Sequence, residues 1–273
     1  MLTLLLAVLA GGAAPPPRIA PLEMPRAAAR PTPPVPTQAE HSAHGRACAA
    51  LAKAEPAKAE AEARAWIKAG GGMAARQCLG VAQSGQDRWS DAAATFESAA
   101  KDAQIAGDPM AVVLWMQAGN SALAGDEAVR ARASFDKALA LRGLSDEMKG
   151  EVFLDRARAA VFANDLTGAR ADLDQATKLV PRDPLGWLLR ANLARRMKDL
   201  PGAFASIREA VALSPQDASI AFEAGNIAAA AGNMEDAKAA WTRAAQKAPE
   251  SDAGRAAAMA LRGEQDAAPS PKP

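Results

Sequence analysis

The sequence predicts an all-α protein, a solenoid of antiparallel helix pairs that follows an apolar N-terminus and a proline-rich segment. Three observations support this prediction. Hydrophobic residues make up 49% of the chain but aromatic residues only 4%, with no Tyr, and alanine supplies most of the apolar residues. Alanine favours helix, and its small side chain suits a core made by stacking many thin helices. The other two observations are a recurring spacing of small and bulky residues and a recurring set of turn residues.

Residues 1–14 are predicted to be a secretory signal peptide. The apolar run Leu2–Ala10 precedes small residues at positions 11–14, as in the hydrophobic and cleavage regions of such a peptide. The run is too short for a membrane span, which needs ~20 apolar residues. An apolar tail without a targeting role is the alternative. Together with an Ala- and Arg-rich composition typical of high-GC bacteria, the signal peptide predicts a periplasmic or secreted protein.

Residues 15–41 are predicted to form a disordered, proline-rich linker. Nine prolines lie between Pro15 and Thr37, and proline at this density favours extended, solvated backbone. The segment fits a spacer or, alternatively, a ligand for an aromatic groove on a partner. His41 and His44 have the i, i+3 spacing that two metal ligands on one helix face can have. No further His, Cys or Asp completes a site nearby, so we expect no metal and no cofactor.

The solenoid is predicted over residues 42–262, and residues 42–69 are expected to form a helix pair that caps its N-terminal end. Its helices are predicted over Ala43–Ala54 and Ala57–Lys68, and they lack the repeat spacing, as a terminal cap does. Cys48 lies on the first of these helices and Cys78 on the first helix of the next pair. An oxidising compartment permits a disulfide between them; the alternative is two buried free thiols.

Five repeats are predicted over residues 73–251. Each has Gly or Ala, Ala twelve residues later, a bulky apolar residue four further on, and Ala three further on. Small residues at these positions would let the two helices of a pair cross closely, and the bulky residue would fill the gap to the next pair. Recurrence at a fixed period indicates a repeat architecture. The five sets are Gly80, Ala92, Phe96, Ala99; Gly119, Ala131, Phe135, Ala138; Ala157, Ala169, Leu173, Ala176; Ala191, Ala203, Ile207, Ala210; and Gly225, Ala237, Trp241, Ala244.

Turn and capping residues mark the ends of the predicted helices. Ser145 and Asp183 are expected to cap helix starts, the second directly before a proline at the first helical position. Residues 252–262 are predicted to form a closing helix, and residues 263–273, which are polar and proline-containing, a disordered tail. The turns inside the helix pairs are predicted at Gly125–Asp126, Asn164–Asp165, Lys198–Asp199 and Gly232–Asn233.

The repeat resembles the tetratricopeptide repeat family, whose 34-residue unit is two antiparallel helices. The last three sets match this period, and the family's early aromatic residue is present as Trp115, Phe153 and Trp187. The family's tyrosine is absent from all five repeats. The resemblance implies a right-handed superhelix in which the first helices of the pairs line a concave groove. In the family that groove commonly receives an extended peptide or a partner helix.

The predicted groove residues follow from that resemblance. The residue after the Gly or Ala of each first helix should face the groove, and at four repeats it is an amide or a guanidinium. Asn offers both a donor and an acceptor to a peptide backbone, and an apolar strip beside it would suit an extended peptide. The alternative is that these Asn residues only solvate an exposed helix face. The candidate residues are Asn120, Arg158, Asn192 and Asn226, flanked by Gln77, Met116, Leu154, Leu188 and Phe222.

The function predicted from these features is a non-catalytic scaffold of the bacterial cell envelope that binds a protein or an extended peptide. A formal net charge of +1 and a pI of about 7.8 give no basis for nucleic-acid binding. The repeats contain no histidine, and no phosphate-binding loop follows a strand, so we expect no enzyme. A structural, self-associating assembly element and an accessory or glycan-binding module of an envelope complex are the alternatives.

Overall fold

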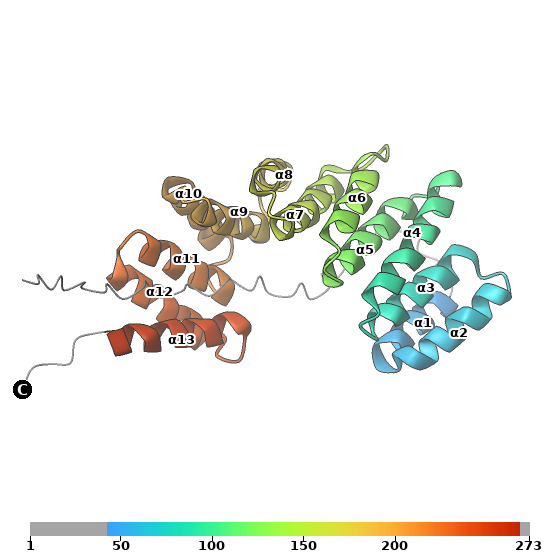
Figure 1. The fold of residues 1–273 in the computed structure, drawn as a ribbon, viewed down its shortest axis with the longest axis horizontal. Helices are drawn as coiled ribbons and strands as arrows, with labels where there is room; N and C mark the ends of the chain where they lie inside the picture. The colour runs from blue at the N-terminus through green and yellow to red at the C-terminus, as the bar shows by residue number, and fades with distance from the viewer. Residues whose placement is uncertain (1–42, 268–273) are drawn as a thin grey trace, which may run out of the picture.

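The computed structural model describes residues 43–267, and these residues form only helices (Figure 1). The N-terminal and C-terminal ends of the array are helices that lie outside the five repeats. The helices are α1 (Ala43–Ala54), α2 (Pro56–Lys68), α3 (Gly72–Ser84), α4 (Trp89–Ile105), α5 (Met110–Ala124), α6 (Ala128–Leu139), α7 (Asp146–Phe162), α8 (Leu166–Leu179), α9 (Pro184–Arg196), α10 (Leu200–Leu213), α11 (Ala218–Ala230), α12 (Met234–Lys247) and α13 (Asp252–Ala267).

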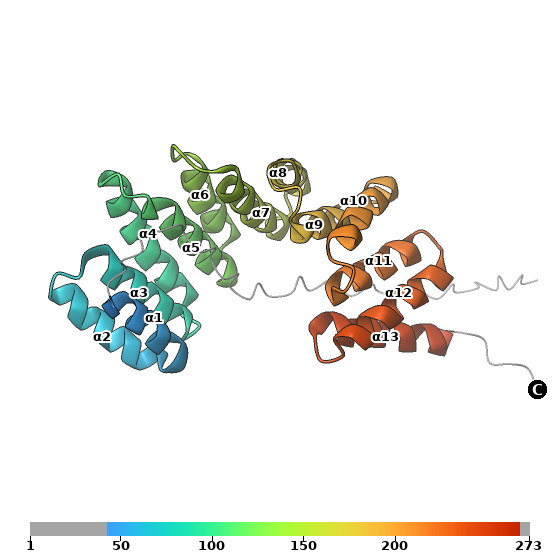
Figure 2. The ribbon, with the colours of Figure 1, turned by 180° about the vertical axis from the view of Figure 1, so that it is seen from behind.

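The helices stack in chain order into an arch, with α1–α4 at one foot and α11–α13 at the other (Figures 1 and 2). Each helix packs mainly against its neighbours in sequence. From α5 to α12, contact within a pair is more extensive than contact between pairs, whereas α4 packs most extensively against α5 of the next pair. Around the middle of the arch, α5, α7 and α9 lie on the inner side and α6, α8 and α10 on the outer side (Figure 1). This is the predicted all-α solenoid of antiparallel helix pairs.

The small residue of each first helix lies under the bulky residue of its own pair. A Cβ atom added to Gly119 would lie 2.5 Å from Cε1 of Phe135, far inside van der Waals contact. Gly80 lies under Phe96 and Gly225 under Trp241 in the same way. The sequence analysis placed these bulky residues in the gap to the next pair and so missed this contact.

The size of the small residue varies with the residue that covers it. Glycine occurs where an aromatic ring covers the crossing, as in the pairs α3–α4, α5–α6 and α11–α12. Alanine occurs where the covering residue is aliphatic: Ala157 with Leu173, and Ala191 with Ile207, all four buried. A larger side chain on the second helix thus accompanies a smaller residue on the first helix, as expected where the volume of a close-packed interior is fixed.

The turns inside the pairs place one residue in the left-handed region. In the four pairs from α5 to α12 that residue is, in order, Asp126, Asn164, Lys198 and Gly232, with φ angles of 63°, 60°, 62° and 81°. These are the turns predicted from the sequence. Of the four, Lys198 has the least favourable residue type for this conformation, because Asn, Asp and Gly adopt it more readily.

Two aspartates at helix starts have two partners each. Asp165 Oδ1 accepts the backbone N–H of Gly168 at 2.8 Å and its Oδ2 accepts Arg132 Nη1 of the preceding pair at 2.7 Å. Asp199 repeats the arrangement one pair later, with Gly202 and Arg170 as donors. These hydrogen bonds lower the pKa of Asp165, the backbone bond being the larger cause. The predicted caps are also present, since Ser145 and Asp183 accept N–H groups of the first turns of α7 and α9.

The core differs along the arch. One continuous apolar cluster runs from α4 to α7 and contains Phe96, Trp115 and Phe135. Beyond it the core divides into smaller clusters, one around Leu173, one around Ile207 and Ile227, and one around Trp241. Helices α4 to α7 therefore share one core, whereas α1–α3 and the later pairs have separate, smaller clusters.

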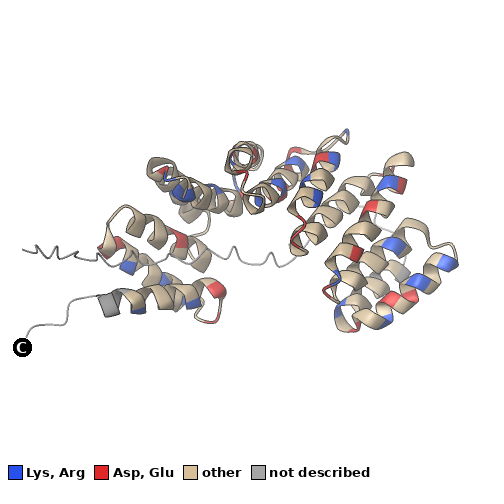
Figure 3. Ribbon diagram, in the orientation of Figure 1, with Lys and Arg blue, Asp and Glu red and all other residues tan. Residues whose placement is uncertain are grey.

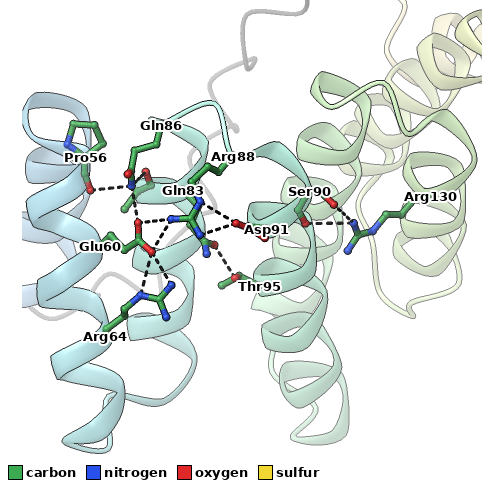
Figure 4. A network of polar contacts seen from close by, with 11 residues as sticks. Pro56, Glu60, Arg64, Gln83, Gln86, Arg88, Ser90, Asp91, Thr95 and Arg130 are labelled. Carbon is green, nitrogen blue, oxygen red and sulfur yellow. Dashed lines mark hydrogen bonds and ion pairs between the residues drawn. The ribbon is translucent and has the colours of Figure 1, made fainter.

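The predicted cap pair, α1–α2, is joined to the first repeat by a polar network (Figure 4). Glu60 of α2 accepts hydrogen bonds from Arg64, from Gln86 Nε2 at 2.8 Å and from Arg88 Nη1 at 2.7 Å. These bonds lower the pKa of Glu60 to about 2, against an ordinary value of 4.5. On the other side of the pair, Cys48 and Cys78 have their Cα atoms 6.0 Å apart and their sulfur atoms within bonding distance.

The C-terminal helix is longer than predicted. Helix α13 runs to Ala267 and so continues through residues 263–267, which the sequence analysis placed in a disordered tail. Glu264, Gln265 and Asp266 are compatible with helix, and no proline interrupts the chain before Pro269. The predicted signal peptide and linker, with His41, lie outside the described residues.

Candidate peptide-binding surface

The candidate groove residues lie in register on the first helices of successive pairs. Asn120 is on α5, Arg158 on α7, Asn192 on α9 and Asn226 on α11, each directly after the small residue at the helix crossing. All four side chains are partly buried. Each is therefore held in place by its neighbours while keeping some contact with solvent, which a binding residue needs.

Asn120 and Arg158 share a buried carboxylate between α5 and α7. Asp155 is only 3% exposed; its Oδ2 accepts Asn120 Nδ2 at 2.9 Å and its Oδ1 accepts Arg158 Nη1 at 3.1 Å. A buried carboxylate needs such donors to remain charged. The amide at this position therefore joins two pairs, in addition to any contact with a ligand.

A second buried carboxylate lies between α9 and α11. Glu223, also 3% exposed, accepts Arg195 Nε at 2.7 Å and the Nδ2 atoms of Asn192 and Asn226, each at 3.2 Å. Asn226 in turn accepts Trp241 Nε1 at 3.0 Å. Asn226 thus uses both ends of its amide inside the protein, whereas the amide oxygen of Asn192 accepts no hydrogen bond within residues 43–267.

Between α7 and α9 the surface is hollowed. The hollow is small and is lined by Arg158 and Asn192 together with apolar side chains that include Val161, Leu189 and Leu193. No acidic residue of the described chain lines it. The two predicted binding residues at the centre of the arch therefore lie on either side of a small, mostly apolar depression.

The predicted apolar strip is only partly available. Leu188 and Phe222 are half-buried and can contact a ligand. Met116 and Leu154 at the equivalent positions are 4% and 1% exposed and belong to the core, so the expectation that they flank the groove is wrong. Gln77 donates to Gln117 of α5 at 3.1 Å and so joins its own pair to the next.

In the described helices, Lys and Arg alternate with Asp and Glu along the whole arch (Figure 3). Within residues 43–267 no group of three or more His, Cys, Asp or Glu side chains is arranged to hold a metal ion. The same residues contain no helix that is both long and apolar enough to cross a membrane.

These observations define the class of protein as an all-α solenoid of stacked helix pairs with a partly polar inner surface. Residues 154–218 match the family described as tetratricopeptide repeat. No curated protein sequence matches the chain. This match to the tetratricopeptide repeat family begins within α7 and ends at the start of α11.

Solved structures show the same fold over most of the described chain. PilF of Pseudomonas aeruginosa is 14% identical with a TM-score of 0.60, covering 82% of this chain and 97% of its own. A thermophilic TPR protein of Thermus thermophilus is 20% identical with a TM-score of 0.54, covering 68% of this chain and 97% of its own. YrrB, described as a TPR protein with an unusual peptide-binding site, is 18% identical with a TM-score of 0.51, covering 72% of this chain and 96% of its own.

The sequence analysis missed both buried carboxylates, Asp155 and Glu223. Each occupies the position two residues before the small residue of its helix, where other repeats have Gln117 or Leu189. A signal was present, because an Asn of the preceding first helix accompanies each carboxylate. Comparison of these two positions across consecutive repeats would have found the pairing.

Proposed function

We propose that this chain is a non-catalytic scaffold of the bacterial cell envelope that binds a protein or an extended peptide along the inner side of its arch. The observation that carries the proposal is the small hollow between α7 and α9, which is lined by Arg158, Asn192 and apolar side chains. An extended peptide is bound through main-chain hydrogen bonds and through apolar contacts with alternate side chains, and both kinds of group are present here.

The free hydrogen-bonding groups suit an extended backbone. Asn120 and Asn192 use amide N–H groups to hold carboxylates, while their amide oxygens accept no hydrogen bond within residues 43–267. An amide oxygen facing the groove can accept a peptide N–H. The fold shared with YrrB, which is described as having a peptide-binding site, supports the same interpretation.

The envelope location is supported by two features. The predicted signal peptide would direct export, and Cys48 and Cys78 are close enough to be bonded, which an oxidising compartment would favour. Periplasmic fractionation of cells that express the full chain tests the location directly, and recovery in the cytoplasm with both thiols free would contradict it.

The binding proposal is tested with a displayed library of random peptides about 12 residues long, selected against the full chain. Titration of a selected peptide should show at least about a tenfold loss of affinity when Leu188 and Phe222 are both changed to Ala, because truncation of apolar anchors in a binding site has effects of this size. The matched control is Phe204→Ala, an exposed aromatic residue on the outer helix α10. Equal affinities for all three proteins would place the peptide elsewhere and reject the groove.

Self-association is the second candidate. Phe204 and Val211 are exposed and seven residues apart on α10, so they share one face of the helix. A second copy could cover that face. Sedimentation equilibrium at increasing protein concentration separates the two functions, since a scaffold that acts alone stays a monomer.

A further inference from the structure

The inner side of the arch follows a pattern of donors and acceptors between consecutive first helices. We call the residue after the small residue the donor position and the residue two before it the acceptor position. Between α5 and α7 the donor is Asn120 and the acceptor is Asp155, 2.9 Å apart. Between α9 and α11 the donor is Asn192 and the acceptor is Glu223, 3.2 Å apart.

The junction between α7 and α9 breaks this pattern. Its donor position is Arg158, the one cation in the series, and its acceptor position is Leu189, the one aliphatic residue among the acceptors from α5 to α11. Arg158 instead turns back to Asp155 on its own helix through a single bond from Nη1. Its Nε and Nη2 atoms make no hydrogen bond within residues 43–267. The hollow lies at this junction, between Arg158 and Asn192.

We propose that the α7–α9 junction binds an acidic side chain of the partner, whose carboxylate takes the place that Asp155 and Glu223 occupy at the flanking junctions. This inference rests on the proposed peptide binding and names the chemistry of its central contact. Arg158 would donate through its free N–H groups and Asn192 through the second hydrogen of its amide. A guanidinium has five donors, and charge-assisted bonds to a carboxylate are the strong ones.

The walls of the hollow suit such a side chain. Val161 and Leu189, which are both partly exposed, would contact the methylene groups of Asp or Glu, and their low polarity strengthens a hydrogen bond made beside them. Among the described residues, no carboxylate lines the hollow. The adjacent Asp155 already has Asn120 as a second donor, so Arg158 can turn toward a ligand without leaving Asp155 unpaired.

A first experiment supplies the missing carboxylate from the chain itself. Leu189→Glu and Leu189→Gln differ only in charge and have nearly the same shape. If Arg158 can accept a carboxylate at this position, Leu189→Glu should melt about 2–4 °C above Leu189→Gln, which corresponds to one charge-assisted bond in a protein of this size. An equal or lower midpoint for Leu189→Glu would overturn the proposal. The test needs no ligand and is independent of the proposed function.

A second experiment uses the peptides selected from the displayed library. We expect the binders to share an Asp or Glu whose replacement by Asn or Gln lowers affinity about ten- to hundredfold. In Arg158→Gln that difference should disappear, whereas in Arg170→Gln, an arginine of α8 paired with Asp199, it should remain. Leu189→Glu should lose binding of the acidic peptide because its own carboxylate fills the site.

The outcomes separate the two proposals. Binders without a shared acidic residue, or an acidic residue whose loss matters equally in Arg158→Gln, would reject the acidic contact and leave peptide binding intact. A folded chain that selects no peptide at all would reject the proposed function itself. Thermal denaturation of each variant confirms that loss of binding is not loss of the fold.

Discussion

The pairs α3–α6 and α7–α10 have the same backbone plan but are held together differently. In the first region the crossings are glycine under phenylalanine, and one apolar cluster continues from α4 to α7. In the second region the crossings are alanine under Leu173 or Ile207 and the core is divided. Arginine–carboxylate pairs join helices in both regions. The comparison shows that one repeat geometry can be built around a continuous apolar core or around a divided one.

The largest expected effect tests this difference with two tryptophans at equivalent repeat positions. Trp115 is 1% exposed inside the continuous cluster, whereas Trp187 is half-buried and donates to Pro181 O at 2.8 Å. Trp115→Ala should lower the free energy of unfolding by about 3–5 kcal/mol and Trp187→Ala by about 1–2 kcal/mol, because less apolar area is lost. Chemical denaturation measures both, and equal losses would remove the distinction between the regions.

The next effect concerns the glycine crossings. Gly119→Ala should lower the free energy of unfolding by about 1–3 kcal/mol, because the new Cβ would collide with the ring of Phe135. Adding Phe135→Leu should recover much of that loss, since the double variant has the alanine–leucine combination found at Ala157 and Leu173. A double-mutant cycle gives the coupling. If the two losses simply add, the size match at the crossing does not stabilise the pair.

The third prediction concerns the polar network that joins the N-terminal cap pair to the first repeat. Glu60→Gln should destabilise the protein by about 1–2 kcal/mol at pH 7, because it removes charge-assisted bonds from Arg64 and Arg88. The folded-state pKa of Glu60, about 2, lies below its ordinary 4.5. The contribution of ionised Glu60 to the stability of the folded protein is therefore complete above pH 4.5, and it is lost as the pH falls through 4.5 toward 2.

The measurement for Glu60 is the melting midpoint of both proteins between about pH 7 and pH 2.5. The gap between wild type and Glu60→Gln should narrow as acid protonates the carboxylate. Asp91→Asn is a suitable control, since Asp91 also pairs with Arg88 but is largely exposed. A gap that stays constant with pH would show that the charge of Glu60 is not what joins the cap to the array.

The smallest effect is expected at the pair Arg170–Asp199 on α8 and the start of α10. The side chain of Arg170 is 48% exposed, so solvent screens the interaction. Arg170→Gln should therefore lower the free energy of unfolding by less than about 0.5 kcal/mol. The loss should shrink further in about 1 M salt. A loss above about 1 kcal/mol would show that the second region depends on this pair more than its exposure implies.

The fold was predictable because its signals are local and repeat. The spacing from Gly119 to Phe135 recurs in all five repeats, and caps such as Ser145 and turn residues such as Asn164 follow from backbone chemistry within a few residues. The extent of α13 was not predictable in the same way, because polar residues such as Glu264 fit both a helix and a solvated tail.

The candidate site was predicted only in part. The repeat register placed Arg158 and Asn192 on the inner side, where they line the hollow. It did not identify Asp155 or Glu223, because a carboxylate on a single helix resembles an ordinary solvated face until its donors on the next helix are known. It also predicted that Met116 flanks the groove, whereas the thicker core of the first region buries that side chain.

Asp165 and Asp199 each bind the first turn of their own helix with one oxygen and an arginine of the preceding pair with the other. The start of α8 and the start of α10 therefore each depend on a neighbour on the N-terminal side. Cutting the array before α7 would remove Arg132 and leave the cap of α8 with its backbone bond alone. Nearest-neighbour coupling in this protein thus has a direction, and fraying after such a cut should begin at the new N-terminal edge and spread toward α13.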